Sequence, residues 1–184
     1  MNPTYKENAL LLESVDFFRL DANRKLDPGH RLALGQFMTP PATARLMASM
    51  FETNRQSIRL LDAGAGVGSL IAAFIEETCV RSIKPKHVHV TAYEVDGMLA
   101  TYLADTLRQC QRACEDAGIK FESDLIERDF IDDGVRMLRQ EMFAPTRRFN
   151  CAILNPPYKK ISSDEVGMST AALQFSKVPG DARH

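Results

Sequence analysis

The chain has 184 residues, a formal net charge of −1 at pH 7, 45% hydrophobic residues and 26% charged residues, the proportions of an ordinary soluble globular domain. No stretch approaches the ~20 apolar residues of a membrane span, and the polar opening does not resemble a signal peptide. We therefore expect a cytoplasmic protein, without the basic excess that a self-sufficient DNA-binding domain usually carries.

Two helices are predicted before the first strand. Residues 5–26 carry apolar side chains at roughly helical spacing, namely Leu10, Leu11, Val15, Phe17 and Phe18. The turn at Asp27-Pro28-Gly29 ends this stretch, and we assign residues 1–34 to an N-terminal helical segment. Residues 35–41, GQFMTPP, have the composition of a loop, and their prolines open the second helix.

From residue 58 onward, strands and helices alternate. Strands are predicted at 58–61, 87–94, within 120–127 and at 149–154, and the helices between them at 67–79, 96–117 and about 133–142. This alternation predicts an α/β, Rossmann-like fold with a parallel sheet and helices on both faces. Right-handed crossovers bring the carboxyl ends of the strands to one edge, where such folds bind ligands. Residues 35–161 form this domain, and 162–184 are expected to be a poorly ordered tail.

A glycine-rich loop follows the first predicted strand and contains Asp62, Gly64, Gly66 and Gly68. Glycines permit a tight turn and a close approach of ligand to backbone, although dinucleotide cofactors use similar loops and a ligand-free turn is an alternative. Asp62 would repel a pyrophosphate but could support an ammonium group. The loop also lacks the Gly-Lys-Ser/Thr ending of a P-loop.

Carboxylates also follow the second and third predicted strands. Glu94 could accept hydrogen bonds from both hydroxyls of a ribose, as in dinucleotide folds, or it could be a solvated carboxylate at a strand end. Asp129 could accept from an adenine amino group while Phe130 lies against the ring. Taken alone, this second pair is also ordinary turn chemistry.

The four cysteines are Cys79, Cys110, Cys114 and Cys151. They form no C-x-x-C pair, and Cys110 and Cys114 are expected to share one helix face. A metal pair there is the weaker alternative, and buried thiols that fill helix faces are the favoured interpretation, with no metal site.

The most informative stretch is Asn155-Pro156-Pro157-Tyr158, directly after the fourth predicted strand. Two consecutive prolines restrict the backbone and remove two N–H donors. The Asn155 side chain and the nearby carbonyl groups can therefore face a ligand. A plain proline turn is the alternative, which the position after a buried strand disfavours.

Taken together, these motifs resemble a known family. Asn-Pro-Pro-Tyr is similar to the motif of amino-group methyltransferases, and GQFMTP, LDAGAGVG, AYEVD and RDF accompany it here. From about residue 35 to 161 the chain resembles the gamma-order adenine-N6 DNA methyltransferases of type II restriction-modification systems. The resemblance implies a class I methyltransferase fold, the cofactor S-adenosyl-L-methionine and double-stranded DNA as the substrate, methylated at a specific site.

The resemblance also implies a role for each matching residue. The cofactor would contact Phe37 and Thr39 beside its methionine part, Asp62, Gly64, Gly66 and Gly68 at its methionine end, Glu94 at its ribose, and Asp129 and Phe130 at its adenine. The Phe37 ring would lie near the sulfonium.

The Asn-Pro-Pro-Tyr residues would act on the target base. Asn155 and the Pro156 carbonyl would accept hydrogen bonds from the adenine amino group, Pro157 completes the motif, and Tyr158 would stack on the flipped base. An aromatic amine is a poor nucleophile because its lone pair is delocalised into the ring. Two acceptors aimed at N6 localise that pair for in-line attack on the methyl group, and the remaining work is positioning.

The chain departs from the family pattern after Tyr158. A complete enzyme would continue with three more strands and a DNA-recognition region, whereas about two dozen residues follow here. Four strands would leave one sheet edge unpaired. We therefore expect a C-terminally truncated chain: an amino-terminal fragment, a degenerate copy or one half of a split enzyme. A missing C-terminal half or a separate recognition subunit is the expected partner.

Other functions stay open. The same motif can present the amide nitrogen of a protein glutamine, RNA adenine is another substrate, and the chain could be a non-catalytic fragment that binds S-adenosylmethionine. GQFMTP favours DNA, and a glutamine enzyme would be expected to carry a different amino-terminal domain. Basic residues beside the motif either contact phosphate or are solvated surface charges: Arg147, Arg148, Lys159 and Lys160.

Overall fold

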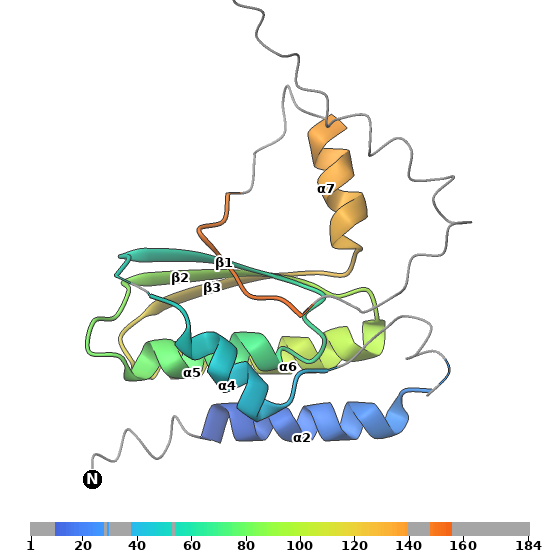
Figure 1. Ribbon diagram of the computed structural model, residues 1–184, viewed down its shortest axis with the longest axis horizontal. Coiled ribbons are helices and arrows are strands. Elements are labelled where there is room, and N and C mark those ends of the chain that lie inside the picture. The colour runs from blue at the N-terminus through green and yellow to red at the C-terminus, as the bar shows by residue number, and fades with distance from the viewer. Residues whose placement is uncertain (1–9, 28, 30–37, 53, 140–147, 156–184) are drawn as a thin grey trace, which may run out of the picture.

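The computed structural model describes residues 10–27, 29, 38–52, 54–139 and 148–155. Helices and strands alternate along most of this length (Figure 1). In chain order they are α2 (Leu10–Lys25), α4 (Pro41–Ser49), β1 (Ser57–Ala63), α5 (Ser69–Val80), β2 (His87–Tyr93), α6 (Gly97–Asp116), β3 (Lys120–Ile126), α7 (Phe130–Arg139) and β4 (Cys151–Ala152). No helix in these ranges is both long and apolar enough to span a membrane.

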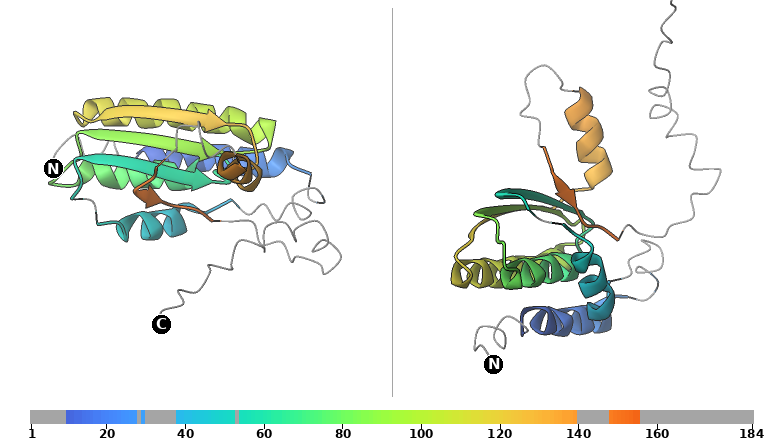
Figure 2. Two further views of the ribbon diagram at one scale, coloured as in Figure 1. Left: turned by 90° about the horizontal axis from the view of Figure 1, so that it is seen from above. Right: turned by 60° about the vertical axis from the view of Figure 1, so that its left-hand side comes forward.

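The described strands form one parallel sheet of four strands in the order β3-β2-β1-β4 (Figure 2, left). Leu60 of β1 pairs with Val90 of β2 on one side and with Cys151 of β4 on the other. The strand order therefore reverses at β1, and doubly wound sheets bind ligands at such a reversal, outside the carboxyl ends of the strands. The predicted Rossmann-like α/β class is confirmed.

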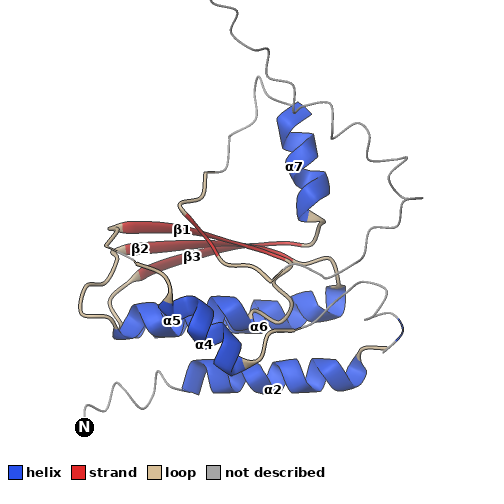
Figure 3. Ribbon diagram, in the orientation of Figure 1, coloured by secondary structure: helices blue, strands red, loops and turns tan. Residues whose placement is uncertain are grey.

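Helices cover the two faces of the sheet unequally. In Figure 1, α2, α4, α5 and α6 lie on one side of the sheet, and α7 rises on the other. The crossovers from β1 to β2 and from β2 to β3 run in the same direction, so right-handedness places α5 and α6 on one face. The crossover from β3 to β4 runs back past β1 and places α7 on the opposite face. Figure 3 shows the short loop that leads from β3 directly into α7.

The core lies between the sheet and the layer of α5 and α6. Ile58, Leu60, Val88 and Val90 of the strands are completely buried. Leu12 and Val15 of α2 belong to the same cluster, although they come from the segment assigned to residues 1–34. The domain boundaries at residues 34 and 161 stay a prediction.

Three of the cysteines also belong to this core. Cys79 of α5 and Cys110 and Cys114 of α6 are buried and free, and the Cys79 thiol lies 3.5 Å from the Ala113 carbonyl. Burial raises the pKa of the Cys110 thiol. These three thiols fill the facing surfaces of α5 and α6.

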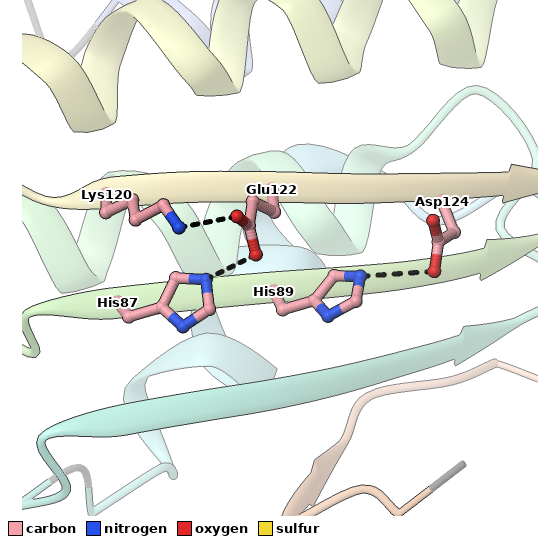
Figure 4. Close-up of polar contacts among 5 residues, drawn as sticks. All are labelled: His87, His89, Lys120, Glu122 and Asp124. Atoms are coloured by element: carbon pink, nitrogen blue, oxygen red, sulfur yellow. Dashed lines mark hydrogen bonds and ion pairs between the residues drawn. The ribbon is translucent and has the colours of Figure 1, made fainter. Parts of the chain in front are cut away.

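The opposite sheet face carries polar side chains near the amino ends of β2 and β3. His87 Nε2 lies 2.9 Å from Glu122 Oε2, and His89 Nε2 lies 3.1 Å from Asp124 Oδ2 (Figure 4). The two histidine side chains keep exposures of 30% and 33%. Strands covered on both faces are usually continuous apolar runs. His87-Val88-His89-Val90 alternates because the described helices cover only its valine face.

Local contacts explain where predicted boundaries were wrong. The helix predicted at 133–142 begins at Phe130 instead, because Asp129 Oδ1 accepts from the backbone N–H groups of Ile131 and Asp132, the geometry of an N-cap. The helix predicted from residue 67 begins at Ser69, since Gly68 has a left-handed φ of 87°. The fourth strand is shorter than the predicted 149–154. It is preceded by Asn150, whose side chain accepts from the Arg59 N–H.

Candidate functional site

A cavity of about 360 Å³ opens where the segments after β1, β2, β3 and β4 meet, at the carboxyl edge of the sheet. Small-molecule sites in proteins typically have volumes of ~300–1,000 Å³. Its wall includes these residues predicted from the sequence: Thr39, Gly64, Gly66, Glu94, Asp129, Phe130 and Asn155. Motifs that are far apart in the sequence therefore surround one space.

The end of β2 holds the glycine loop in place. The N–H groups of Gly64 and Ala65 both donate to the Tyr93 carbonyl at 2.9 Å. Gly64 has a φ of +83°, and a Cβ there would meet no atom within 4 Å. The backbone conformation at position 64 therefore favours glycine. The absence of a side chain there also leaves space in the cavity.

Gly68 has a different role from Gly64. Its φ is +87°, and a Cβ would lie only 2.8 Å from Thr106 Cγ2 and 2.9 Å from Leu103 Cδ1. Thr106 in turn donates to the Val67 carbonyl at 2.7 Å. Gly68 is not part of the cavity wall; it lets the loop pack closely against α6.

Glu94 ties the loop to the end of β2. Its Oε2 accepts from the Gly66 N–H at 2.7 Å, and its Oε1 accepts from the Val95 and Asp96 N–H groups, each at 2.9 Å. Burial raises the pKa of the Glu94 carboxyl, and these backbone hydrogen bonds oppose the shift. An ionised carboxylate has about four acceptor positions. Three are occupied, and the remaining one, on Oε2, can accept from a ligand hydroxyl.

Asp62 lies near the end of β1, before the glycine loop, and is not part of the cavity wall. It is completely buried, and neither carboxyl oxygen has a hydrogen-bond partner among the described residues. Desolvation, with a further contribution from the nearby Glu94 charge, raises the pKa of Asp62 well above its usual value. Burial therefore disfavours the ionised form of Asp62, and the direct contact of this carboxyl with an ammonium group stays a prediction.

Asp129 and Phe130, which follow β3, form a further part of the cavity wall. The Phe130 ring packs edge-on against Tyr93 with ring centres 5.1 Å apart, and the Tyr93 hydroxyl donates to Asp133 Oδ2 at 2.9 Å. Tyr93 thereby holds the start of α7 against the sheet. Because Asp129 Oδ1 caps α7, a ligand contact of this side chain falls to Oδ2.

Asn155 and Thr39 meet across 116 positions of sequence. The Asn155 Nδ2 group donates to Thr39 Oγ1 at 3.2 Å, and Thr39 itself is 6% exposed. This bond orients the amide, because Nδ2 is directed to Thr39 and Oδ1 is the atom that can accept from a ligand. Phe37, Pro156, Pro157 and Tyr158 lie outside the described residues, and their roles stay predictions.

Sequence reasoning missed several residues of the cavity wall, including Ser69, Tyr93, Val95, Arg128 and Ile131. Each is the direct sequence neighbour of a predicted residue, which was the available signal. Ser69 is the most informative of them because it is 4% exposed and its hydroxyl has no hydrogen-bond partner among the described residues.

Comparisons with known proteins agree with this arrangement. The chain is 39% identical over 160 residues to type II methyltransferase M.PstI of Providencia stuartii, which covers 87% of this chain and 30% of that protein. It is 38% identical over 158 residues to type II methyltransferase M.BsuBI of Bacillus subtilis, covering 84% of this chain and again 30% of the relative. The chain thus spans about a third of the length of these curated relatives. No protein-family model matches it.

The fold has a counterpart among solved structures. A structure from Listeria monocytogenes, described as a class I S-adenosylmethionine-dependent methyltransferase, aligns with a TM-score of 0.56 at 18% identity. The alignment covers 88% of this chain and 43% of that one. The chain therefore has the class I S-adenosylmethionine-dependent methyltransferase fold, and it is related in sequence to a segment of these two type II methyltransferases.

Proposed function

We propose that this chain is the cofactor-binding and catalytic part of a site-specific DNA adenine-N6 methyltransferase, the modification enzyme of a restriction-modification system. One observation carries the proposal: Asn155, the first residue of Asn-Pro-Pro-Tyr, lies in the wall of the same cavity as the glycine loop and Glu94. The type II methyltransferases at 38–39% identity support DNA as the substrate. The adenine amino group as the target rests on the motif itself.

The described residues fit S-adenosyl-L-methionine as the cofactor. Glu94 offers one acceptor position for a ribose hydroxyl, and Phe130 with Asp129 forms a wall suited to the adenine ring. The loop at Gly64 and Gly66 brings backbone close to the remaining space, where the methionine end would lie. When bound, the cofactor supplies an electrophilic methyl group.

The chain itself activates and orients the target nitrogen. Asn155 Oδ1 accepts a hydrogen bond from the adenine amino group, which localises the nitrogen lone pair, and the Thr39 bond to Nδ2 keeps the amide in that orientation. Positioning of the nitrogen for in-line attack provides the rest of the rate enhancement. The Pro156 carbonyl and Tyr158 are the second acceptor and the stacking ring of this proposal.

Recognition of the DNA sequence is assigned outside the described residues. The chain corresponds to 30% of each type II relative, and its net charge of −1 provides no general attraction to phosphate. We assign recognition to a region that corresponds to the part of the type II relatives outside the match, or to a separate recognition subunit.

Transfer of labelled methyl groups tests the proposal. Purified chain, with and without the remaining part of a type II relative, is incubated with labelled S-adenosylmethionine and adenine-containing duplex DNA, RNA or protein. Label in the N6-methyladenine of DNA, lost in Asn155→Ala, is the expected result. Transfer confined to RNA or to protein glutamine contradicts the DNA assignment. Cofactor binding without any transfer would indicate a non-catalytic fragment.

A further inference from the structure

Exposed cationic side chains gather at the amino end of the sheet, opposite the cavity. Each described strand contributes, and the residues, which we call the basic row, are Arg148 before β4, Arg55 and Arg59 at β1, Lys84 and Lys86 before β2, and Lys120 at β3. The Lys86 N–H donates to the Gln56 carbonyl at 2.9 Å, and the Lys120 N–H donates to the Lys86 carbonyl at 3.0 Å. The Arg59 Nε group donates to the Arg148 carbonyl at 2.6 Å. The basic row therefore follows the strand order along this edge.

Most of the basic row has no neutralising partner. Lys120 Nζ pairs with Glu122 Oε1 at 2.6 Å (Figure 4). The other five residues of the row form no ion pair with a described residue. Two exposed carboxylates lie in the adjoining segments, Glu52 before β1 and Asp116 at the end of α6. Cations therefore outnumber anions at the amino edge.

The loops at the carboxyl edge carry the opposite charge. Arg128 is the one cation in their described ranges, 62–68, 94–98 and 127–133, and the anions there are Asp62, Glu94, Asp96, Glu127, Asp129, Asp132 and Asp133. The seven residues of β1 separate the two edges by about 20 Å. The net charge of −1 thus conceals a separation of charge, and the described residues attract phosphate at the amino edge.

Arg148 belongs to this amino edge and not to the reactive corner. In the sequence it is one of the basic residues beside the Asn-Pro-Pro-Tyr motif. In the structure it precedes β4, whereas Asn155 follows that strand. A phosphate contact of Arg148 therefore falls away from the target base.

We propose that the basic row binds the phosphate backbone of duplex DNA at a surface separate from the catalytic cavity. Neighbouring strands lie ~4.8 Å apart, so four strands extend the row over roughly 14 Å. One DNA strand carries a phosphate every ~3.4 Å along the helix axis, so a row of this length can contact several phosphates. A line of long cationic side chains matches a linear polyanion. Such contacts carry no sequence information, and they hold the chain on DNA outside the methylated site, which goes beyond the proposed function.

Fluorescence anisotropy with a labelled duplex made only of G·C pairs tests this inference. That duplex has the phosphate backbone but no adenine, so its binding is independent of the target base and of methyl transfer. Lys84→Gln/Lys86→Gln and Arg55→Gln/Arg148→Gln each remove two positive charges from the basic row. Arg24→Gln/Arg108→Gln is the matched control, since it removes the same charge from exposed residues of α2 and α6.

The unmodified chain should bind the duplex with an affinity that falls as the salt concentration rises. Each phosphate contact contributes about 0.9 to the slope of log affinity against log salt. Both row variants should therefore show a slope smaller by about 1.8 and an affinity about tenfold lower at ~0.1 M salt, and the control should match the unmodified chain. Equal losses in the control, no loss in the row variants, or no binding by the unmodified chain at low salt would overturn the inference. Displacement of the duplex by polyglutamate as readily as by unlabelled duplex would assign the row to an acidic protein surface instead.

Discussion

Three glycines with nearly the same backbone conformation have different surroundings, which makes them a sharp test of the site. Gly64, Gly68 and Gly118 have φ values of +83°, +87° and +74°. A Cβ on Gly64 or Gly118 would meet nothing within 4 Å, whereas on Gly68 it would meet side chains at 2.8 and 2.9 Å. Gly64 lines the cavity, and Gly118 follows α6 away from it.

Substitution of each glycine by alanine separates three effects. Gly118 reports backbone strain alone, Gly68 adds steric crowding, and Gly64 adds a contact with the ligand. The left-handed conformation costs a non-glycine residue about 1–2 kcal/mol, and a reduced entropy of the unfolded chain offsets ~0.4–1 kcal/mol of this. Gly64→Ala and Gly118→Ala should therefore destabilise the chain about equally, by roughly 1 kcal/mol. Gly68→Ala adds about 1–3 kcal/mol for overpacking against α6.

Urea denaturation measures the stabilities, and titration with S-adenosylmethionine measures binding. Gly64→Ala should lose affinity because its methyl group occupies space beside the ligand, whereas Gly118→Ala should bind normally. The reasoning is refuted if Gly118→Ala loses as much affinity as Gly64→Ala, or if Gly68→Ala is no less stable than Gly118→Ala.

Three further predictions follow from the contacts of the site. Glu94→Gln replaces one carboxylate oxygen by an NH₂ group, so at least one backbone N–H loses its acceptor. Urea denaturation should show that the free energy of unfolding falls by about 1–3 kcal/mol. An unchanged stability would contradict the role of Glu94 in holding the glycine loop. Tyr93→Phe removes the hydroxyl bond to Asp133 and should cost about 1–2 kcal/mol by the same assay, whereas no loss would mean that this bond does not hold α7. Asp62 keeps its proton in the folded chain at pH values where the unfolded chain releases it, so the free energy of unfolding should fall as the pH rises above 3.8. Asp62→Asn should flatten that fall in stability above pH 3.8, with Glu94 retaining part of it, and identical profiles for the variant and the unmodified chain would contradict the raised pKa of Asp62.

The order of strands and helices could be predicted because each element has a clear pattern of apolar residues. The burial of Asp62 was not predicted, because the first strand was expected to end at Leu61 and Asp62 was assigned to the ligand from its position at the head of the glycine loop. In the structure β1 extends to Ala63, so Ile58, Leu60 and Asp62 alternate along the strand and share its covered face.

Other features depend on contacts that no local pattern reveals. The bond from Asn155 to Thr39 joins residues 116 positions apart, and it exists only because β4 returns beside β1. Similarly, Asp129 could serve either a ligand or a helix start. The structure shows its Oδ1 in the cap of α7, which moved the helix three residues earlier than predicted.

Binding of S-adenosylmethionine to the purified chain tests the central claim most directly. Isothermal titration should show one site per chain, with affinity reduced in Glu94→Gln, because that variant disturbs both the glycine loop and the ribose acceptor. Equal binding by the chain and the variant would place the cofactor elsewhere. A folded chain that binds no S-adenosylmethionine would contradict the assignment of the cavity as a cofactor site.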